Sequence, residues 1–141
     1  SRQGETIAEP AADRPPESGH ETILVVEDEP AILKMTEMML KRLGYTVLTA
    51  GTPQEAMRAA ASHSDSLDIL MTDVVMPESN GLELARRIKQ FHPDLKCLFM
   101  SGYTADVIVS HGILEKGMQY IQKPFSKKDL SVKVREVLYP T

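Results

Sequence analysis

The feature that most constrains the fold is a regular alternation of short apolar runs with longer segments of helical periodicity. The first run, Ile23-Leu24-Val25-Val26, is continuously apolar, as strands are when both faces of a sheet are covered. Strands are predicted at residues 23–26, 45–50, 67–72, 95–100 and 118–122. Helices are predicted at residues 30–43, 53–62, 82–91, 105–114 and 127–138. Repeated strand–helix units predict an α/β fold, a parallel sheet with helices on both faces.

Turn and capping residues support several of these boundaries. Gly44 follows the first predicted helix, where glycine commonly ends helices. Thr52 and Glu55 have the spacing of a capping box, in which each side chain binds the backbone of the other. Ser126 is expected to cap the last helix, with Asp129 at its third position. These signals indicate short connections between elements, as compact domains have.

The composition is that of one ordinary domain preceded by a tail. The chain has 141 residues, of which 42% are hydrophobic and 26% charged. Residues 1–20 hold three prolines and almost no large apolar side chains, which predicts a flexible linker or tail before a domain at 21–139. The apolar runs are far shorter than the about 20 residues that cross a bilayer. We therefore expect no membrane contact by this domain.

Charge and cysteine content narrow the possible partners and location. The net charge is −4, which argues against non-specific nucleic-acid binding because such binding needs a basic face. The single cysteine, Cys97, excludes an internal disulfide and lies in an apolar run, where a buried, inert thiol is expected. A cytoplasmic location is predicted. That prediction also covers a domain at the cytoplasmic end of a longer protein.

Chemically distinctive side chains follow the predicted strands. Glu27 and Asp28 follow the first strand, Asp73 the third, Ser101 the fourth and Lys123 the fifth. Ligands of open α/β sheets bind beyond the carboxyl ends of the strands, so these side chains are expected to meet at one edge. Taken singly, each has an ordinary structural explanation, such as a solvated acidic turn or a strand exit. Their shared position in the predicted fold is what indicates a site.

The expected site has the chemistry of phosphoryl transfer. Carboxylates without a neighbouring histidine or cysteine suit hard cations, which predicts Mg²⁺ or Mn²⁺. A metal ion, the Lys123 ammonium and the Ser101 hydroxyl together would stabilise the negative charge on the oxygens of a transferring phosphoryl group. The Asp73 carboxylate could then act as the nucleophile and form an acyl phosphate.

At these residues the sequence resembles the receiver domains of response regulators. Four segments carry the resemblance, which extends over about residues 22–139: Val25–Pro30, Thr72–Pro77, Met100–Tyr103 and Gln122–Phe125. The resemblance implies a flavodoxin-like (βα)5 fold, doubly wound, with parallel strands in the order 2-1-3-4-5. It also implies two-component phosphorelay signalling, in which the domain accepts a phosphoryl group from phosphohistidine and switches its partner binding.

The resemblance assigns metal-site roles to individual residues. Asp73 is expected to be the phosphoacceptor and, with Asp28, a direct Mg²⁺ ligand. The backbone carbonyl of Val75 would be the third protein ligand, and Glu27 would act through water. Many relatives have Asp at the position of Glu27, which has a longer reach and the same charge.

The resemblance also assigns catalytic and switch roles to individual residues. Lys123 and Ser101 are expected to bind the phosphoryl oxygens, and Ser101 and Tyr120 to form the switch. The bond between Lys123 and Pro124 is expected to be cis.

The expected partner is a sensor histidine kinase or a histidine phosphotransfer protein. No direct contact with nucleic acid is predicted, and the domain is expected to be a monomer or a weak dimer. The join at Glu21–Asp28 and the Ser101-Gly102-Tyr103 loop resemble the C-terminal receiver of hybrid sensor histidine kinases, so that origin is favoured over a stand-alone receiver. It is left open whether the chain counts as an enzyme, because such domains transfer and hydrolyse their own phosphoryl group.

Other functions compete with this interpretation. A haloacid dehalogenase-type hydrolase also has an Asp nucleophile after a strand, but it has a second Asp two residues later, where this chain has Val75. A receiver-like interaction module that takes no phosphate is a further alternative, against which the complete set of acids and lysine argues. A flavin-binding module with the same fold is the last alternative.

Overall fold

The computed structural model describes residues 20–76, 79–102 and 118–140. Five strands form one parallel sheet in the order β2-β1-β3-β6-β7. They are β1 (Thr22–Val26), β2 (Thr46–Ala50), β3 (Leu67–Asp73), β6 (Lys96–Ser101) and β7 (Tyr120–Gln122). These are the five predicted strands taken in chain order, so the predicted order 2-1-3-4-5 is confirmed.

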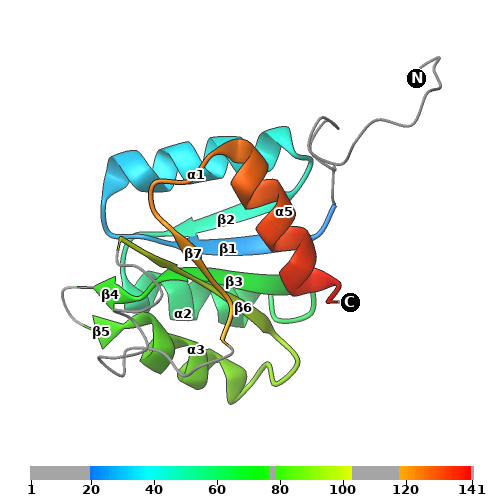
Figure 1. Cartoon of the computed structure of the whole chain (residues 1–141). Coiled ribbons are helices and arrows are strands. Elements are labelled where there is room, and N and C mark those ends of the chain that lie inside the picture. Colours follow the sequence, from blue (N-terminus) through cyan, green and yellow to red (C-terminus); the bar gives the residue numbers. More distant parts are fainter. Residues whose placement is uncertain (1–19, 77–78, 103–117, 141) are drawn as a thin grey trace.

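Helices cover both faces of this sheet, as Figure 1 shows. Helices α1 (Pro30–Arg42) and α5 (Lys127–Leu138) lie on one face, and α2 (Pro53–Ser62) and α3 (Gly81–Lys89) on the other. The predicted doubly wound α/β fold is therefore confirmed. The helix predicted at residues 105–114 and residues 1–19 of the predicted tail lie outside the described residues.

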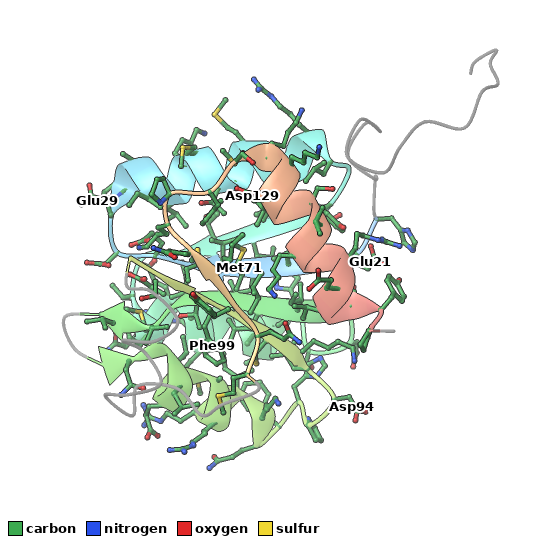
Figure 2. The ribbon with its side chains drawn as sticks, viewed as in Figure 1. Glu21, Glu29, Met71, Asp94, Phe99 and Asp129 are labelled. Atoms are coloured by element: carbon green, nitrogen blue, oxygen red, sulfur yellow. The ribbon has the colours of Figure 1, made fainter. Side chains whose placement is uncertain are left out.

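The continuous apolar runs arise because successive strand residues enter different cores. Ile23 and Val25 of β1 pack in the core under α1 and α5, whereas Leu24 and Val26 pack in the core on the α2 and α3 side. Figure 2 shows the same division, with Met71 on the first side of the sheet and Phe99 on the second. Both faces of β1 are covered, so the residues of this strand are apolar on whichever face they lie.

A small antiparallel hairpin was not predicted from the sequence. Strands β4 (Val75–Met76) and β5 (Ser79–Asn80) pair immediately after β3, where a loop was expected. The Asn80 side chain then accepts the backbone N–H of Glu83 at 2.8 Å and caps α3. This cap explains why α3 begins at Gly81, one residue earlier than predicted.

The predicted caps differ in completeness. The Ser126 side chain accepts the N–H of Asp129 and the Asp129 carboxylate accepts the N–H of Ser126, so this capping box is complete. Thr52 accepts the N–H of Glu55 at 3.1 Å, but the Glu55 carboxylate accepts the N–H of Gly51 instead. The capping box at Thr52 and Glu55 is therefore only half formed.

At the amino edge of the sheet, three side chains tie the start of β1 to the end of α5; we call this group the Glu21 clasp. The Tyr139 hydroxyl donates a hydrogen bond to the Glu21 carboxylate, and the Arg135 guanidinium lies 3.6 Å from the same carboxylate. Arg135 also lies 4.5 Å from the centre of the Tyr139 ring. Figure 2 shows Glu21 beside the end of α5, at the opposite edge from Glu29.

None of the helices within the described ranges has the length and apolar character that a membrane crossing requires.

Candidate functional site

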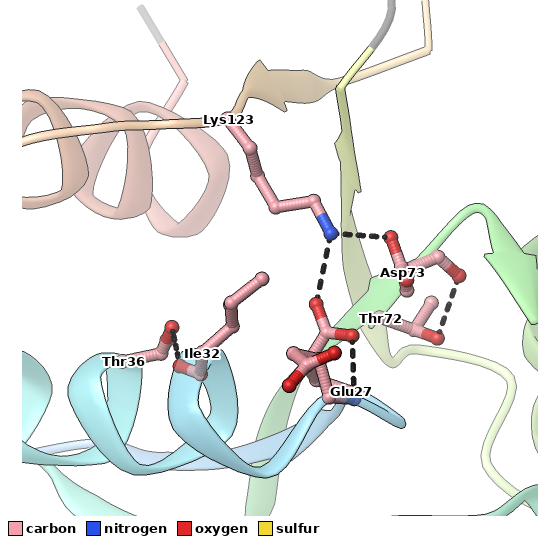
Figure 3. A network of polar contacts seen from close by, with 7 residues as sticks. Glu27, Ile32, Thr36, Thr72, Asp73 and Lys123 are labelled. Atoms are coloured by element: carbon pink, nitrogen blue, oxygen red, sulfur yellow. Dashed lines mark hydrogen bonds and ion pairs between the residues drawn. The ribbon is translucent and has the colours of Figure 1, made fainter.

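A buried polar cluster lies at the carboxyl edge of the sheet. Asp73 is the last residue of β3, Glu27 follows β1 directly, and Lys123 follows β7 directly. Figure 3 shows the Lys123 side chain reaching between the two acids, with its ammonium 2.9 Å from Glu27 Oε1 and 3.1 Å from Asp73 Oδ1. The predicted convergence of these three residues is therefore confirmed.

The acids of this cluster are almost completely shielded from solvent. Glu27 is 1% exposed and Asp73 is 7% exposed. Glu27 uses both carboxylate oxygens, since Oε1 accepts the Lys123 ammonium and Oε2 accepts the backbone N–H of Glu29 at 3.0 Å. Buried charges are tolerated when they are paired in this way.

Burial and charge shift the ionisation of two members of the cluster. Desolvation raises the pKa of Asp73 to about 6; the nearby Glu27 charge also raises it, while the bond to Lys123 lowers it. For Lys123, desolvation lowers the pKa, but the hydrogen bonds to Glu27 and Asp73 outweigh this effect and leave the pKa above its usual value. Lys123 is therefore a permanent cation at neutral pH.

Three carboxylates at this edge are close enough to share a metal ion. Each of Glu27, Asp28 and Asp73 offers a carboxylate oxygen, and these oxygens lie within 4.8 Å of one another. Glu27 and Asp73 are buried, whereas Asp28 is exposed to solvent. The single positive charge of Lys123 does not balance the negative charges of the three carboxylates, so a further cation would be bound favourably here. All of the donors are hard oxygens, which suits a divalent ion of the magnesium type.

The backbone around Asp73 is held closely by β6 and α3. Val74 donates its N–H to the carbonyl of Met100 at 2.9 Å, and its own carbonyl accepts the N–H of Gly81 at 2.7 Å. A Cβ on Gly81 would lie 2.2 Å from the Asp73 carbonyl oxygen and 3.0 Å from Thr72 Cγ2. Only glycine fits at the start of α3, because the helix approaches the Asp73 backbone so closely.

Sequence reasoning missed Gly81. Its only signal was an Asn-Gly pair before a helical segment, which is ordinary turn chemistry and does not reveal a backbone contact.

The remaining predicted site residues lie at or near this edge. Ser101 ends β6, is 3% exposed, and its carbonyl accepts the Lys123 N–H at 2.7 Å. Tyr120 opens β7, paired with Phe99, and is half-buried. Val75 opens β4 with a 55% exposed side chain. The bond between Lys123 and Pro124 is cis, as predicted.

Comparisons with known proteins agree with this geometry. The family model of the response regulator receiver domain matches residues 23–135. Sensor kinase CckA of Brucella abortus (strain 2308) is 38% identical over 121 residues, which cover 86% of this chain and 13% of CckA. The response regulator receiver protein CpdR of the same organism is 32% identical over 116 residues, which cover 82% of this chain and 95% of CpdR.

Solved structures show the same fold. A crystal structure of the receiver domain from the hybrid histidine kinase CckA has a TM-score of 0.70 and 31% identity, over 83% of this chain and 98% of that one. The chain thus spans a small part of the long relative CckA and nearly all of the short relative CpdR.

Proposed function

The chain belongs to the response regulator receiver family, which acts in two-component phosphorelay signalling, and from that premise we propose that Asp73 is its phosphoacceptor. The observation that carries the proposal is the placement of Asp73. It is a buried carboxylate at the carboxyl edge of the sheet, 3.1 Å from a lysine ammonium and within reach of two further acids.

The proposed reaction is a displacement at phosphorus. An Asp73 carboxylate oxygen forms a bond to the phosphorus of a phosphohistidine, and the phosphorus–nitrogen bond breaks. The histidine nitrogen leaves with the electron pair, and Asp73 becomes an acyl phosphate. With a pKa of about 6, Asp73 is mostly ionised at pH 7 and more basic than an ordinary aspartate, which suits a nucleophile.

The surrounding residues supply charge and orientation. Lys123 offers a fixed positive charge beside Asp73, where the oxygens of the attacked phosphoryl group would lie. Ser101, on the strand next to Asp73, is proposed to bind a phosphoryl oxygen through its hydroxyl, and Tyr120 to respond as a switch. The family match supports both roles, and the position of Ser101 at the end of β6 adds support for the first.

The acidic cluster fits a Mg²⁺ ion, or Mn²⁺, as the cofactor. We assign Asp28 and Asp73 as direct ligands, with the Val75 carbonyl, and Glu27 through water. Bound there, the ion would neutralise charge on the transferring phosphoryl group. A haloacid dehalogenase-type hydrolase is not favoured, because residue 75 is valine and the family is that of receivers.

The proposed phosphodonor is a sensor histidine kinase or a histidine phosphotransfer protein. The match at residues 23–135 and the Glu21 clasp support a folded unit of residues 21–139. Similarity to the CckA receiver supports an origin in a hybrid histidine kinase, while CpdR shows that short relatives also exist. The expected cytoplasmic location and monomeric or weakly dimeric state stay predictions.

Phosphorylation of defined variants tests this proposal. Wild-type protein, Asp73→Asn and the control Asp94→Asn are incubated with Mg²⁺ and acetyl phosphate, and the modified residue is located by mass spectrometry. Asp94 is exposed and lies before β6 at the opposite edge from Asp73, so its variant should be modified like the wild type. Modification of Asp73→Asn at the wild-type level, or of another residue in the wild type, would contradict the proposal.

A further inference from the structure

A hollow of about 300 Å³ lies between α3, β6 and the residues just before β7; we call it the α3 hollow. Leu82 and Phe99 contribute apolar surface to its lining. Arg86 and Lys89 border it, and both are exposed. Within the described part of the chain, neither of these cations forms an ion pair with an acid. The hollow therefore combines apolar surface with two uncompensated positive charges.

The surface around the α3 hollow is basic, although the whole chain has a net charge of −4. Arg86, Arg87 and Lys89 all lie in the last turn of α3. Lys96 opens β6 nearby and is exposed. A ligand that matches this surface carries negative charge and at least one apolar side chain, because charge complementarity selects the partner and apolar burial supplies affinity.

One segment of the chain itself has this composition. Residues 1–20 contain four carboxylates and two arginines, and Ile7 is their one large aliphatic side chain. Glu5 and Glu9 stand two residues before and after Ile7. In an extended chain alternate side chains point the same way, so these three would share one face. Pro10 favours an extended conformation for the glutamate that precedes it.

The segment is long enough to reach the α3 hollow. Cys97 and Gln119 place the hollow toward the amino ends of β6 and β7, and Glu21 lies at the same edge, before β1. Only β3 separates β1 from β6, so the lateral distance is about 10 Å. Ile7 lies 14 residues before Glu21. An unstructured chain of that length spans about 20 Å on average and about 46 Å at most, so docking within one molecule needs no strain.

Two other hollows suit the segment less well. The first, of about 260 Å³, lies between α1 and the residues after β7, and the lysine that lines it, Lys123, is already paired with Glu27 and Asp73. The second, of about 350 Å³, lies at the amino edge. Four carboxylates, among them Asp65 and Asp68, and one lysine line it. These carboxylates would repel a segment that brings two glutamates.

We propose that residues 5–9 dock in the α3 hollow of the same molecule. The Ile7 side chain fills the apolar part, and the two glutamates lie beside Arg86 and Lys89. Exposed ion pairs are individually weak, so Ile7 is the anchor and the charges select this hollow over the others. A partner that uses the α3 face must then displace the segment. This inference does not depend on the role of Asp73.

Alkylation of Cys97 tests the proposal, because Cys97 lines the α3 hollow and is the only cysteine of the chain. The full chain, Ile7→Ser, Lys89→Glu and the double variant are treated with N-ethylmaleimide, and the modified fraction is followed by mass spectrometry. Ile7→Ser should speed alkylation about threefold or more in the wild-type background and less than about 1.5-fold in the Lys89→Glu background.

The comparison is made within each background because Lys89 also acts on the thiol directly. Burial raises the pKa of Cys97, and the Lys89 charge lowers it. Two matched controls accompany the cycle. Ala12→Ser lies in the same segment away from Ile7 and should leave the alkylation rate unchanged. Arg87 is exposed on α3 but does not line the hollow, so Ile7→Ser should keep its full effect in the Arg87→Glu background.

A second readout observes the contact itself. In ¹³C-labelled full-length protein, the methyl signals of Ile7, identified by their absence from Ile7→Ser, should show nuclear Overhauser effects to Phe99 or Met118. Lys89→Glu should remove these effects, and Glu9→Lys combined with Lys89→Glu should restore them, because the exchanged charges can pair again.

Each outcome supports or overturns the inference. No change in alkylation with Ile7→Ser in the wild-type background, or an equal change in both backgrounds, would show that the segment does not fill the α3 hollow. Protection of Cys97 that disappears when the protein is diluted would place the segment of a second copy in the hollow, which contradicts docking within one molecule. None of these results bears on phosphorylation of Asp73, which lies at the opposite edge of the sheet.

Discussion

Replacing the proposed phosphoacceptor should stabilise the metal-free protein. Asp73 is 7% exposed, and desolvation raises its pKa to about 6, so the folded state resists ionising this carboxyl. Asp73→Asn keeps the shape of the side chain without the charge. Lys123 retains its bond to Glu27 in the variant, so only its ion pair with residue 73 is lost. We therefore expect Asp73→Asn to be more stable than the wild type at neutral pH.

The size of the effect follows from the pKa shift. A rise from 3.8 to about 6, at 1.36 kcal/mol per unit, corresponds to about 3 kcal/mol of unfolding free energy. The pKa is raised on folding, so the penalty is absent below pH 3.8, where Asp73 is protonated in both states. It grows as the pH rises toward about 6 and is constant above that value. The gain from Asp73→Asn should follow the same course.

Urea unfolding in EDTA at several pH values between 4 and 8 measures this gain. With a typical slope of about 2 kcal/mol per molar urea, the midpoint of Asp73→Asn should be higher by about 1 to 2 M at pH 8. The difference should shrink toward zero near pH 4. The exposed control Asp94→Asn should shift little at any pH. An Asp73→Asn variant that is no more stable at pH 8, or whose gain is the same at pH 4, would refute the reasoning.

Three further predictions concern the metal site, the backbone around it and the Glu21 clasp. Mg²⁺ at a hundredfold excess over its dissociation constant should raise the unfolding free energy of the wild type by about 2.7 kcal/mol, and Asp28→Asn should reduce this gain in thermal melts. Gly81→Ala should lower the unfolding free energy measured in urea by about 1 to 3 kcal/mol and slow phosphorylation, because its Cβ would meet the carbonyl of the phosphoacceptor. Gly102→Ala should do neither, because no atom of the described residues lies within 4 Å of a Cβ placed there. Burial raises the pKa of Glu21, but the hydrogen bond from Tyr139 and the other partners of the carboxylate outweigh burial and hold this pKa below 4.5. Tyr139→Phe should therefore lower the melting temperature, and this loss should begin to shrink below pH 4.5 and vanish once the pH is also below the lower pKa of the folded state, where Glu21 is protonated in both states. A Tyr139→Phe loss that persists undiminished in acid would contradict the assigned role of the clasp.

Much of the fold was predictable because its signals are local. Apolar runs and helical periodicity mark the strands and helices, and Gly44 takes the positive φ of 97° that its position after α1 requires. The acids and the lysine of the site could be predicted to converge because the carboxyl ends of parallel strands share one edge. Glu27, Asp73 and Lys123 were recognised for this reason.

Other features depend on contacts between distant segments and had no local signal. The β4–β5 hairpin was predicted as a loop because two-residue strands have no periodicity to detect. The Glu55 carboxylate has the spacing of a capping box but binds Gly51, a choice made by backbone geometry. The Glu21 clasp joins residues at opposite ends of the domain, which sequence spacing cannot relate.

The sequence by itself determined the α/β class, the strand order through family resemblance, and which side chains reach the carboxyl edge. The tertiary structure alone decided how those side chains share their bonds: that Lys123 is held by Glu27 as well as Asp73, and that α3 leaves no room beside the Asp73 backbone except for glycine. The physical reason is that periodicity depends on neighbours along the chain. Hydrogen bonds and steric fit instead depend on the spacing of segments far apart in the sequence, and a change of a few tenths of an ångström in that spacing matters.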